Sequence, residues 1–122
     1  MTIENGKITS TMLGIEDHGI LSAYLTITFA SGGCSFGGYS LDSWSAGEKR
    51  RVGTAFGTEC IIRILDTVGV EKWEDLKGAF VRVAHTGLGG VIEKIGNLIE
   101  DKWFSFKELS EQYSGRNQSD EQ

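Results

Sequence analysis

The residues best suited to bind a small molecule gather in one short segment, residues 34–42. Phe36 and Tyr39 flank a glycine pair at 37–38, and a basic pair follows at 50–51. Two aromatic rings could sandwich a flat ligand ring above an open glycine backbone, and nearby arginines could hold its phosphates. The same pattern is typical of a strand that ends in a bulge. Both interpretations apply to this segment.

A second candidate for phosphate binding is Arg82, which lies in the alternating stretch Phe80-Val81-Arg82-Val83. Alternation places Arg82 on the same strand face as Phe80 and Ala84. An arginine beside an aromatic ring can bind a phosphate through two parallel hydrogen bonds. The alternative is a salt bridge to one of the 17 acidic residues, and the residue types favour neither interpretation.

Catalytic and metal-binding patterns are weak by comparison. His18 follows Asp17, and histidine as a residue type suits acid–base catalysis, but an exposed turn histidine explains this position as well. The sequence contains no Gly-x-Ser-x-Gly motif and no phosphate-binding Gly-rich loop that ends in Lys-Ser/Thr. The histidines and cysteines lack the spacing of metal ligands. We therefore predict a protein that is not an enzyme and that carries no metal or cofactor.

Composition excludes several classes of partner. The 122 residues include 12 basic and 17 acidic ones, for a net charge of −5. This balance argues against a general DNA- or RNA-binding protein and against attachment to anionic lipid. No apolar run reaches the roughly 18 residues of a membrane span, and the polar start is not a signal peptide. Cys34 and Cys60 are interpreted as reduced thiols of a cytosolic protein, with Cys60 in the core.

The first part of the chain predicts three strands, at residues 7–14, 20–30 and 34–41. The middle one is the clearest, because apolar and polar residues alternate along it. Residues 16–19 have turn chemistry, and the third strand is expected to bulge at its glycine pair. Residues 42–53 are polar and are expected to form an exposed loop.

The second half of the chain predicts a main helix, two strands and a short helix. Thr54 should cap a helix that runs to Val68, and Gly69 should end it. A helical turn is expected at 72–78, strands at 79–84 and 91–99, and a loose hairpin loop between them. Ser105 and Glu108 form a capping box that should start the C-terminal helix.

The predicted class is α+β, an antiparallel β-sheet in the order β-β-β-α-β-β-α with one main helix and a short C-terminal helix. Residues 1–114 should form a single domain, followed by a flexible polar tail at 115–122. A domain this small buries a limited share of its surface, so assembly into oligomers is a plausible way to bury more.

Several stretches resemble a family of small proteins encoded by tailed bacteriophages and prophages. They are LGIEDHGI (13–20), FGGYSLD (36–42), GTAFG (53–57), ILDTVGVEKWEDL (64–76), IGN (95–97) and DKWF (101–104). The layout is similar to that of the phage anti-defence sponges that act against Thoeris immunity by binding a cyclised ADP-ribose signal without cleaving it. The resemblance implies a β-rich domain with two helices, homo-oligomers (dimers or larger), and ligand pockets beside the subunit interface.

This resemblance identifies no pocket residue by itself, so the candidates come from residue chemistry. A cyclic nucleotide needs cations for its phosphates, rings for its base, and polar groups for its hydroxyls. The candidates are Arg50, Arg51, Arg82 and Arg116 for charge; Phe36, Tyr39, Phe80 and Phe104 for stacking; and Asp42, Thr86 and Asn97 for hydroxyls or the base edge.

Three functions follow as hypotheses. The first is a cytoplasmic anti-defence protein, acting in the infected bacterial host, that sequesters a cyclic nucleotide immune signal. The second is a protein–protein inhibitor of a bacterial defence effector, similar to an anti-CRISPR, with an acidic surface formed by Glu71, Glu74, Asp75, Glu100 and Asp101. The third is a small hydrolase that acts on the signal, with His18 or His85 as the base.

Overall fold

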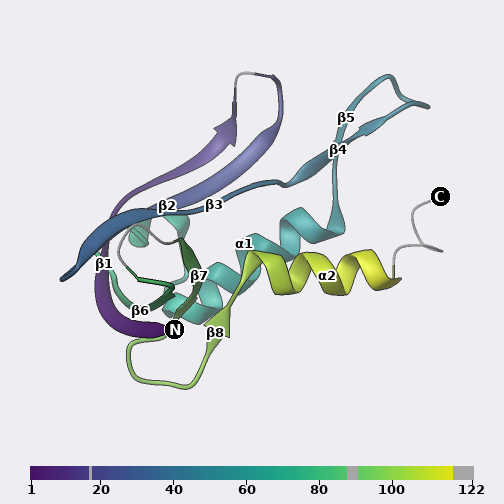
Figure 1. Cartoon of the computed structure of the whole chain (residues 1–122). Helices are drawn as coiled ribbons and strands as arrows, with labels where there is room; N and C mark the ends of the chain where they lie inside the picture. The colour runs from purple at the N-terminus through teal and green to yellow at the C-terminus, as the bar shows by residue number, and fades with distance from the viewer. Residues whose placement is uncertain (17, 88–90, 117–122) are drawn as a thin grey trace.

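The computed structural model describes residues 1–16, 18–87 and 91–116, with side chains described as far as Ser114. It has the predicted α+β class: a curled antiparallel sheet, with two helices at one end of it (Figure 1). The predicted order of the main elements is confirmed, and short strands are added to it. Of the predicted tail, Gly115 and Arg116 continue the last helix, and 117–122 lie outside the described residues.

Six strands form the main sheet, and their spatial order is β3-β2-β1-β6-β7-β8. The strands are β1 (Thr2–Ile15), β2 (Leu21–Phe29), β3 (Gly32–Ser40), β6 (Phe80–His85), β7 (Ile92–Gly96) and β8 (Trp103–Phe104). Strand β2 follows the predicted alternation, with Ala23, Leu25 and Ile27 buried on one face. The sheet curls so far that β3 and β7 become neighbours in space. This curl is what creates the site described below.

The predicted bulge in β3 is confirmed. Pairing between β2 and β3 shifts its register between Ser22 and Tyr24, opposite the glycine pair. Gly37 has φ +125°, and a Cβ atom there would lie 2.5 Å from the carbonyl oxygen of Ala23. Only glycine fits this close approach, so the bulge explains why the sequence has glycine at this position.

The polar segment after β3 is more ordered than the sequence predicted. Instead of a loop, it forms a hairpin of β4 (Asp42–Ser45) and β5 (Arg50–Gly53), which projects from the body of the molecule (Figure 1). Trp44 is 62% exposed on this hairpin. Sequence periodicity missed these strands because each is only four residues long and neither buries an apolar face.

Helix α1 (Ala55–Val68) begins and ends where the sequence predicted. The Thr54 hydroxyl accepts a hydrogen bond from the backbone N–H of Gly57, and Gly69 ends the helix in the left-handed conformation. Cys60 and Ile64 face the core, and burial raises the pKa of the Cys60 thiol to about 12. A short 3₁₀ turn, η1 (Trp73–Asp75), and helix α2 (Phe106–Arg116) match the other two predicted helical segments.

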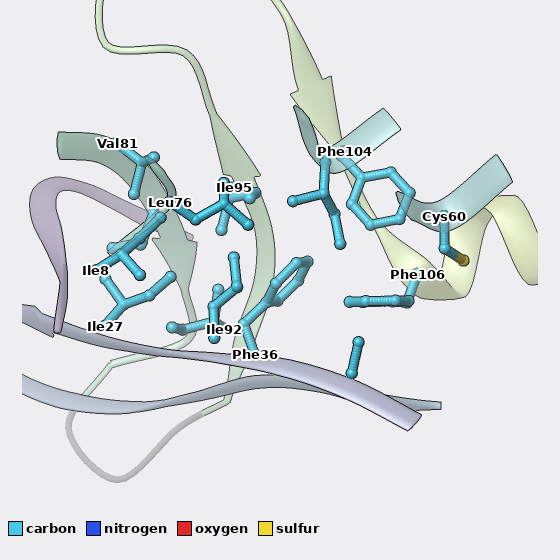
Figure 2. Packing of buried hydrophobic residues seen from close by; sticks show 14 of the residues in the cluster. Ile8, Ile27, Phe36, Cys60, Leu76, Val81, Ile92, Ile95, Phe104 and Phe106 are labelled. Atoms are coloured by element: carbon cyan, nitrogen blue, oxygen red, sulfur yellow. The ribbon is translucent and has the colours of Figure 1, made fainter. Parts of the chain in front are cut away.

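The core has an aliphatic part and an aromatic part. Figure 2 shows Ile8, Ile27 and Val81 on one side and Phe104 and Phe106 on the other, with the ring of Phe36 between them. Phe36, from the bulged strand, contacts the rings of both phenylalanines. Phe106 is the first residue of α2, so this cluster attaches the C-terminal helix to the sheet.

Candidate functional site

A cleft lies at the seam where the curled sheet fails to close. Strands β3 and β7 approach each other there, yet no hydrogen-bonded ladder joins them within the described part of the chain. The cleft has a volume of about 380 Å³. Its lining comes from β3, the start of β7 and the start of α2: Ser35, Phe36, Gly37, Tyr39, Val91, Ile92, Glu93, Phe106 and Lys107. We call this feature the seam cleft.

Aromatic rings form one wall of the seam cleft. Tyr39 stacks on Phe106, with ring centroids 5.2 Å apart and an angle of 8° between the planes. Phe36 also packs on Phe106, at 5.0 Å and 49°. The sequence predicted that Phe36 and Tyr39 would sandwich a flat ring; in the fold, the ring that both contact is the chain's own Phe106. Phe36 is 3% exposed, whereas Tyr39 is 38% exposed and presents aromatic surface at the cleft.

The remaining lining residues add backbone and charge. Gly37 carries no side chain, so its backbone is accessible in the cleft. Val91 is 64% exposed at the opposite rim. Lys107 is the one basic residue among the described residues that line the cleft, and Glu93 is the one acidic residue. The site therefore offers an aromatic surface, open backbone, one cation and one carboxylate.

Arg82 and Asn97 are engaged in holding the fold together, away from the seam cleft. The Arg82 guanidinium donates to the carbonyl oxygens of Asn97 (2.7 Å) and Glu100 (2.9 Å), and lies 4.6 Å from the Trp103 ring centroid. Its partners are carbonyls and a ring, which neither the phosphate nor the salt-bridge interpretation anticipated.

Asn97 connects a turn to a helix end. Its side-chain amide donates to the carbonyl oxygen of Thr67 near the end of α1, at 3.0 Å. Its side-chain oxygen accepts hydrogen bonds from the backbone N–H groups of Ile99 and Glu100. These bonds satisfy backbone groups that a helix end and a turn leave unpaired.

Asp42 and Arg51 pair with each other at the base of the β4–β5 hairpin. Two hydrogen bonds join the Arg51 guanidinium to the Asp42 carboxylate, at 2.8 and 2.9 Å, and the Asp42 side chain is only 8% exposed. Arg51 lowers the pKa of the Asp42 carboxyl, and the carboxylate raises the pKa of Arg51. Arg50 pairs with Glu48 near the hairpin tip, and both of these side chains are exposed.

The other predicted binding residues do not converge on the cleft. Phe80 is 56% exposed on the outer face of the sheet, beneath the ammonium of Lys7 at 5.7 Å. Phe104 is buried in the core, and Thr86 is exposed at the end of β6. The side chain of Arg116 lies outside the described residues. Among the predicted residues, the structure places Phe36 and Tyr39 together in the cleft wall.

Sequence reasoning missed Phe106, Lys107 and Glu93 as cleft residues. The capping box at Ser105 did locate the start of α2, and the N–H of Glu108 donates to the Ser105 hydroxyl as predicted. That signal places Phe106 in the first helical turn. It says nothing of which strand the turn contacts, because this depends on the curl of the whole sheet.

His85, a candidate base, is enclosed in a hydrogen-bonded cluster. Its Nε2 lies 2.6 Å from a Glu4 carboxylate oxygen, and its Nδ1 accepts from the N–H of Gly87 at 3.0 Å. The Ser31 hydroxyl donates to the same carboxylate, and this bond, followed by the one to His85, lowers the pKa of Glu4. The Glu4 carboxylate therefore lies between Ser31 and His85. In a catalytic relay that activates a serine, the histidine lies between the serine and the carboxylate instead. His85 is 3% exposed.

Other candidate sites are not formed by the described residues. His18 is exposed in the turn after β1, and its neighbour Asp17 lies outside the described part. In the described ranges, no group of three His, Cys, Asp or Glu side chains is arranged to hold a metal ion. Neither described helix is long and apolar enough to cross a membrane.

Comparison of the chain with family models, curated proteins and solved structures found no match.

Proposed function

We propose that this protein binds a small cyclic nucleotide of the cyclic ADP-ribose type in the seam cleft and sequesters it without cleavage. The observation that carries the proposal is the stacked pair of Tyr39 and Phe106 beside an open cleft of about 380 Å³. This volume lies within the range of roughly 300–1,000 Å³ that is typical of small-molecule sites, and the cleft combines aromatic surface with polar groups.

The base of the nucleotide would stack on Tyr39. One face of that ring already packs on Phe106 at nearly parallel orientation, so the ring is held rigidly. A rigid aromatic platform binds a base at low entropic cost, and such stacking contributes about 1–3 kcal/mol per base. The exposed part of Tyr39 is the surface available for this contact.

The phosphates would be met by Lys107 and by backbone N–H groups of the strand edges at the seam. One cation per chain is few for a dianion. The predicted oligomer would supply further cations if a second copy lies beside the cleft, as the resemblance implies. Arg50, which is exposed, and Arg116 remain predicted contributors, whereas Arg51 and Arg82 are held by partners in their own chain.

The biological role proposed with this chemistry is phage anti-defence in the cytoplasm of the infected bacterium. A protein that holds an immune signal intact lowers the free concentration of that signal and needs no catalytic group. The family resemblance supports this role, and the volume and aromatic wall of the seam cleft support the binding of a ligand there.

The first experiment is a thermal-shift screen against cyclic ADP-ribose isomers and cyclic di- and trinucleotides. A ligand that binds the native state raises Tm, by an amount set by its concentration relative to Kd. We expect one class of cyclic nucleotide to raise the Tm of the wild-type protein. Tyr39→Ala and Lys107→Glu should reduce that rise, and Phe80→Ala should leave it unchanged. Phe80 is the matched control because it is an exposed ring on another face.

Recovery of the ligand separates sequestration from hydrolysis. After heat denaturation of the complex, a sponge releases the nucleotide intact, and a hydrolase releases products. The proposed site would be contradicted if no member of the panel raised the Tm. It would also be contradicted if Phe80→Ala reduced the ligand-induced rise in Tm as much as Tyr39→Ala does.

A second candidate function is the protein–protein inhibitor, which an acidic surface favours. Glu71, Glu74, Asp75, Glu100 and Asp101 are all exposed. The hydrogen bonds of Asn97 connect the turn before Glu100 to the end of α1, which Glu71 follows closely. Charge reversal at these positions should abolish inhibition of a defence effector under this hypothesis and leave nucleotide binding nearly unchanged.

A further inference from the structure

Strand β1 extends beyond β6, its neighbour on one side. Thr2–Lys7 of β1 pair with β6, and Ile8 makes the last bonds on that side, to Gly78 and Ala79. From residue 9 onward, β1 pairs only with β2, to Ile15. Within the described chain, the outer edge of residues 9–15 therefore has no strand partner. Figure 1 shows this part of the β1–β2 hairpin extending beyond the rest of the sheet.

Apart from a bulge at its first residue, Thr9, this free edge lacks the features that keep strand edges from pairing with other strands. Residues 9–15 read Thr-Ser-Thr-Met-Leu-Gly-Ile and contain no charge and no proline. Natural edges are commonly protected by lysine, proline, a bulge or a short length. The one bulge in β1 lies between Ile8 and Ser10, and pairing with β2 then runs in regular register from Ser10 to Ile15.

The apolar side chains on this segment are exposed at the margin of the core. Leu13 is 39% exposed and Ile15 is 67% exposed. They pair across to Ala23 and Leu21, so they lie on the core-facing side of the sheet, beyond the end of the core. Exposed apolar residues beside unpaired backbone are typical of a surface that pairs with another strand.

We propose that a second copy of this chain pairs with this edge, strand to strand and antiparallel, about a two-fold axis at Met12. Met12 is the midpoint of residues 9–15, so this register pairs the whole free edge. Because the two-fold axis is perpendicular to the sheet, the core-facing side chains of both copies lie on the same face of the joined sheet. Leu13 of one copy then meets Thr11 of the other, and Ile15 meets Thr9.

Charge favours a second copy as the occupant. The free edge is flanked by Lys7 at one end and Glu16 at the other. Antiparallel pairing brings the Lys7 end of one copy beside the Glu16 end of the other, so opposite charges approach at both ends. The result is a continuous sheet that runs β3-β2-β1 in one copy and β1-β2-β3 in the other. The inference does not depend on nucleotide binding.

The test is the mass of the full chain in solution, by light scattering or sedimentation across a dilution series. We expect a dimer, or a larger assembly built from it. Leu13→Lys should halve that mass while leaving the circular dichroism spectrum unchanged. Ile62→Lys is the matched control, because Ile62 is 52% exposed on α1 and away from this edge. A monomeric wild type, or a Leu13→Lys variant with unchanged mass, would overturn the proposal.

A cysteine test checks the register. In a background with Cys34→Ser, Met12→Cys places two thiols opposite each other on the axis, within reach of a disulfide. Ser10→Cys places them several residues apart along the strands. Rapid oxidation to a covalent dimer with Met12→Cys alone supports the register. Equal cross-linking of both variants, or of neither, contradicts it.

Discussion

Arg82 and Asn97 lie where β6, β7 and β8 are paired, and their polar groups bind carbonyl and N–H groups of their own chain. Tyr39 and Lys107 lie at the seam, where the sheet is not closed, and they line a cleft. Both regions contain a basic residue beside an aromatic ring: Arg82 lies over Trp103 in the first, and Lys107 follows Phe106 in the second. Residue type alone therefore does not mark a binding residue: what matters is whether the fold already supplies its partner.

Phe106 connects the two regions, and replacing it should lower the free energy of unfolding more than any other substitution considered below. Its ring is 2% exposed and contacts Phe36, Tyr39 and Phe104. Phe106→Ala should lower the free energy of unfolding by about 3–5 kcal/mol, because it removes a buried ring and leaves a cavity. Urea denaturation measures this. A loss below about 1 kcal/mol would show that the seam does not depend on this ring.

Arg82→Ala tests the region where β6, β7 and β8 are paired. It removes two hydrogen bonds to carbonyls and the contact with Trp103, so we expect a loss of about 1.5–3 kcal/mol in unfolding free energy. Arg50→Ala is the control, because the Arg50–Glu48 pair is exposed and should contribute less than about 0.5 kcal/mol. Similar losses in the two variants would contradict the structural role of Arg82.

The Asp42–Arg51 pair predicts a pH dependence of smaller size. Arg51 lowers the pKa of Asp42, so the stabilisation is fully present above the unfolded pKa of about 3.9 and is lost as pH falls through the lower folded pKa. Asp42→Asn should therefore lower Tm by a few degrees at neutral pH. The difference from wild type should shrink in acid, below about pH 4.

The control for this pH profile is Glu48→Gln, which breaks an exposed ion pair on the same hairpin. Its Tm should stay close to that of the wild type at every pH. If the Asp42→Asn difference were the same at acidic and neutral pH, the charge of Asp42 would not be the source of the stabilisation.

Tyr39→Ala should have the smallest effect on stability and a large effect on binding. Tyr39 is partly exposed, so the expected loss is about 1 kcal/mol or less, mainly from its stacking on Phe106. Urea denaturation measures the stability, and calorimetric titration with the nucleotide that raises Tm measures the affinity. A variant with reduced stability and unchanged affinity would remove Tyr39 from the proposed site.

The sequence predicted those features that short stretches of chain determine. The alternation of β2, the Thr54 and Gly69 ends of α1, the Ser105 cap and the bulge at Gly37 all depend on residues close together in the chain. Each involves a local periodicity, a capping side chain or a backbone position that needs glycine, and each is confirmed.

The candidate site was predicted only in part, because it depends on contacts between distant segments. Asn97 bonds to Thr67, and Tyr39 stacks on Phe106, although each pair is far apart in sequence. No local pattern indicates that the sheet curls until β3 faces β7, so the seam and the position of Lys107 beside it could not be foreseen. The short strands of the β4–β5 hairpin and β8 were missed because they are too short for a periodic signal.

Binding at the seam can be mapped by NMR chemical shifts of the ¹⁵N-labelled protein during titration with cyclic ADP-ribose isomers. We predict that amide shifts concentrate at the seam, at Gly37, Tyr39, Glu93 and Lys107, while those of Arg82 and Asn97 change little. Shifts centred on Arg82 and Asn97, or no shifts at saturating nucleotide, would contradict it.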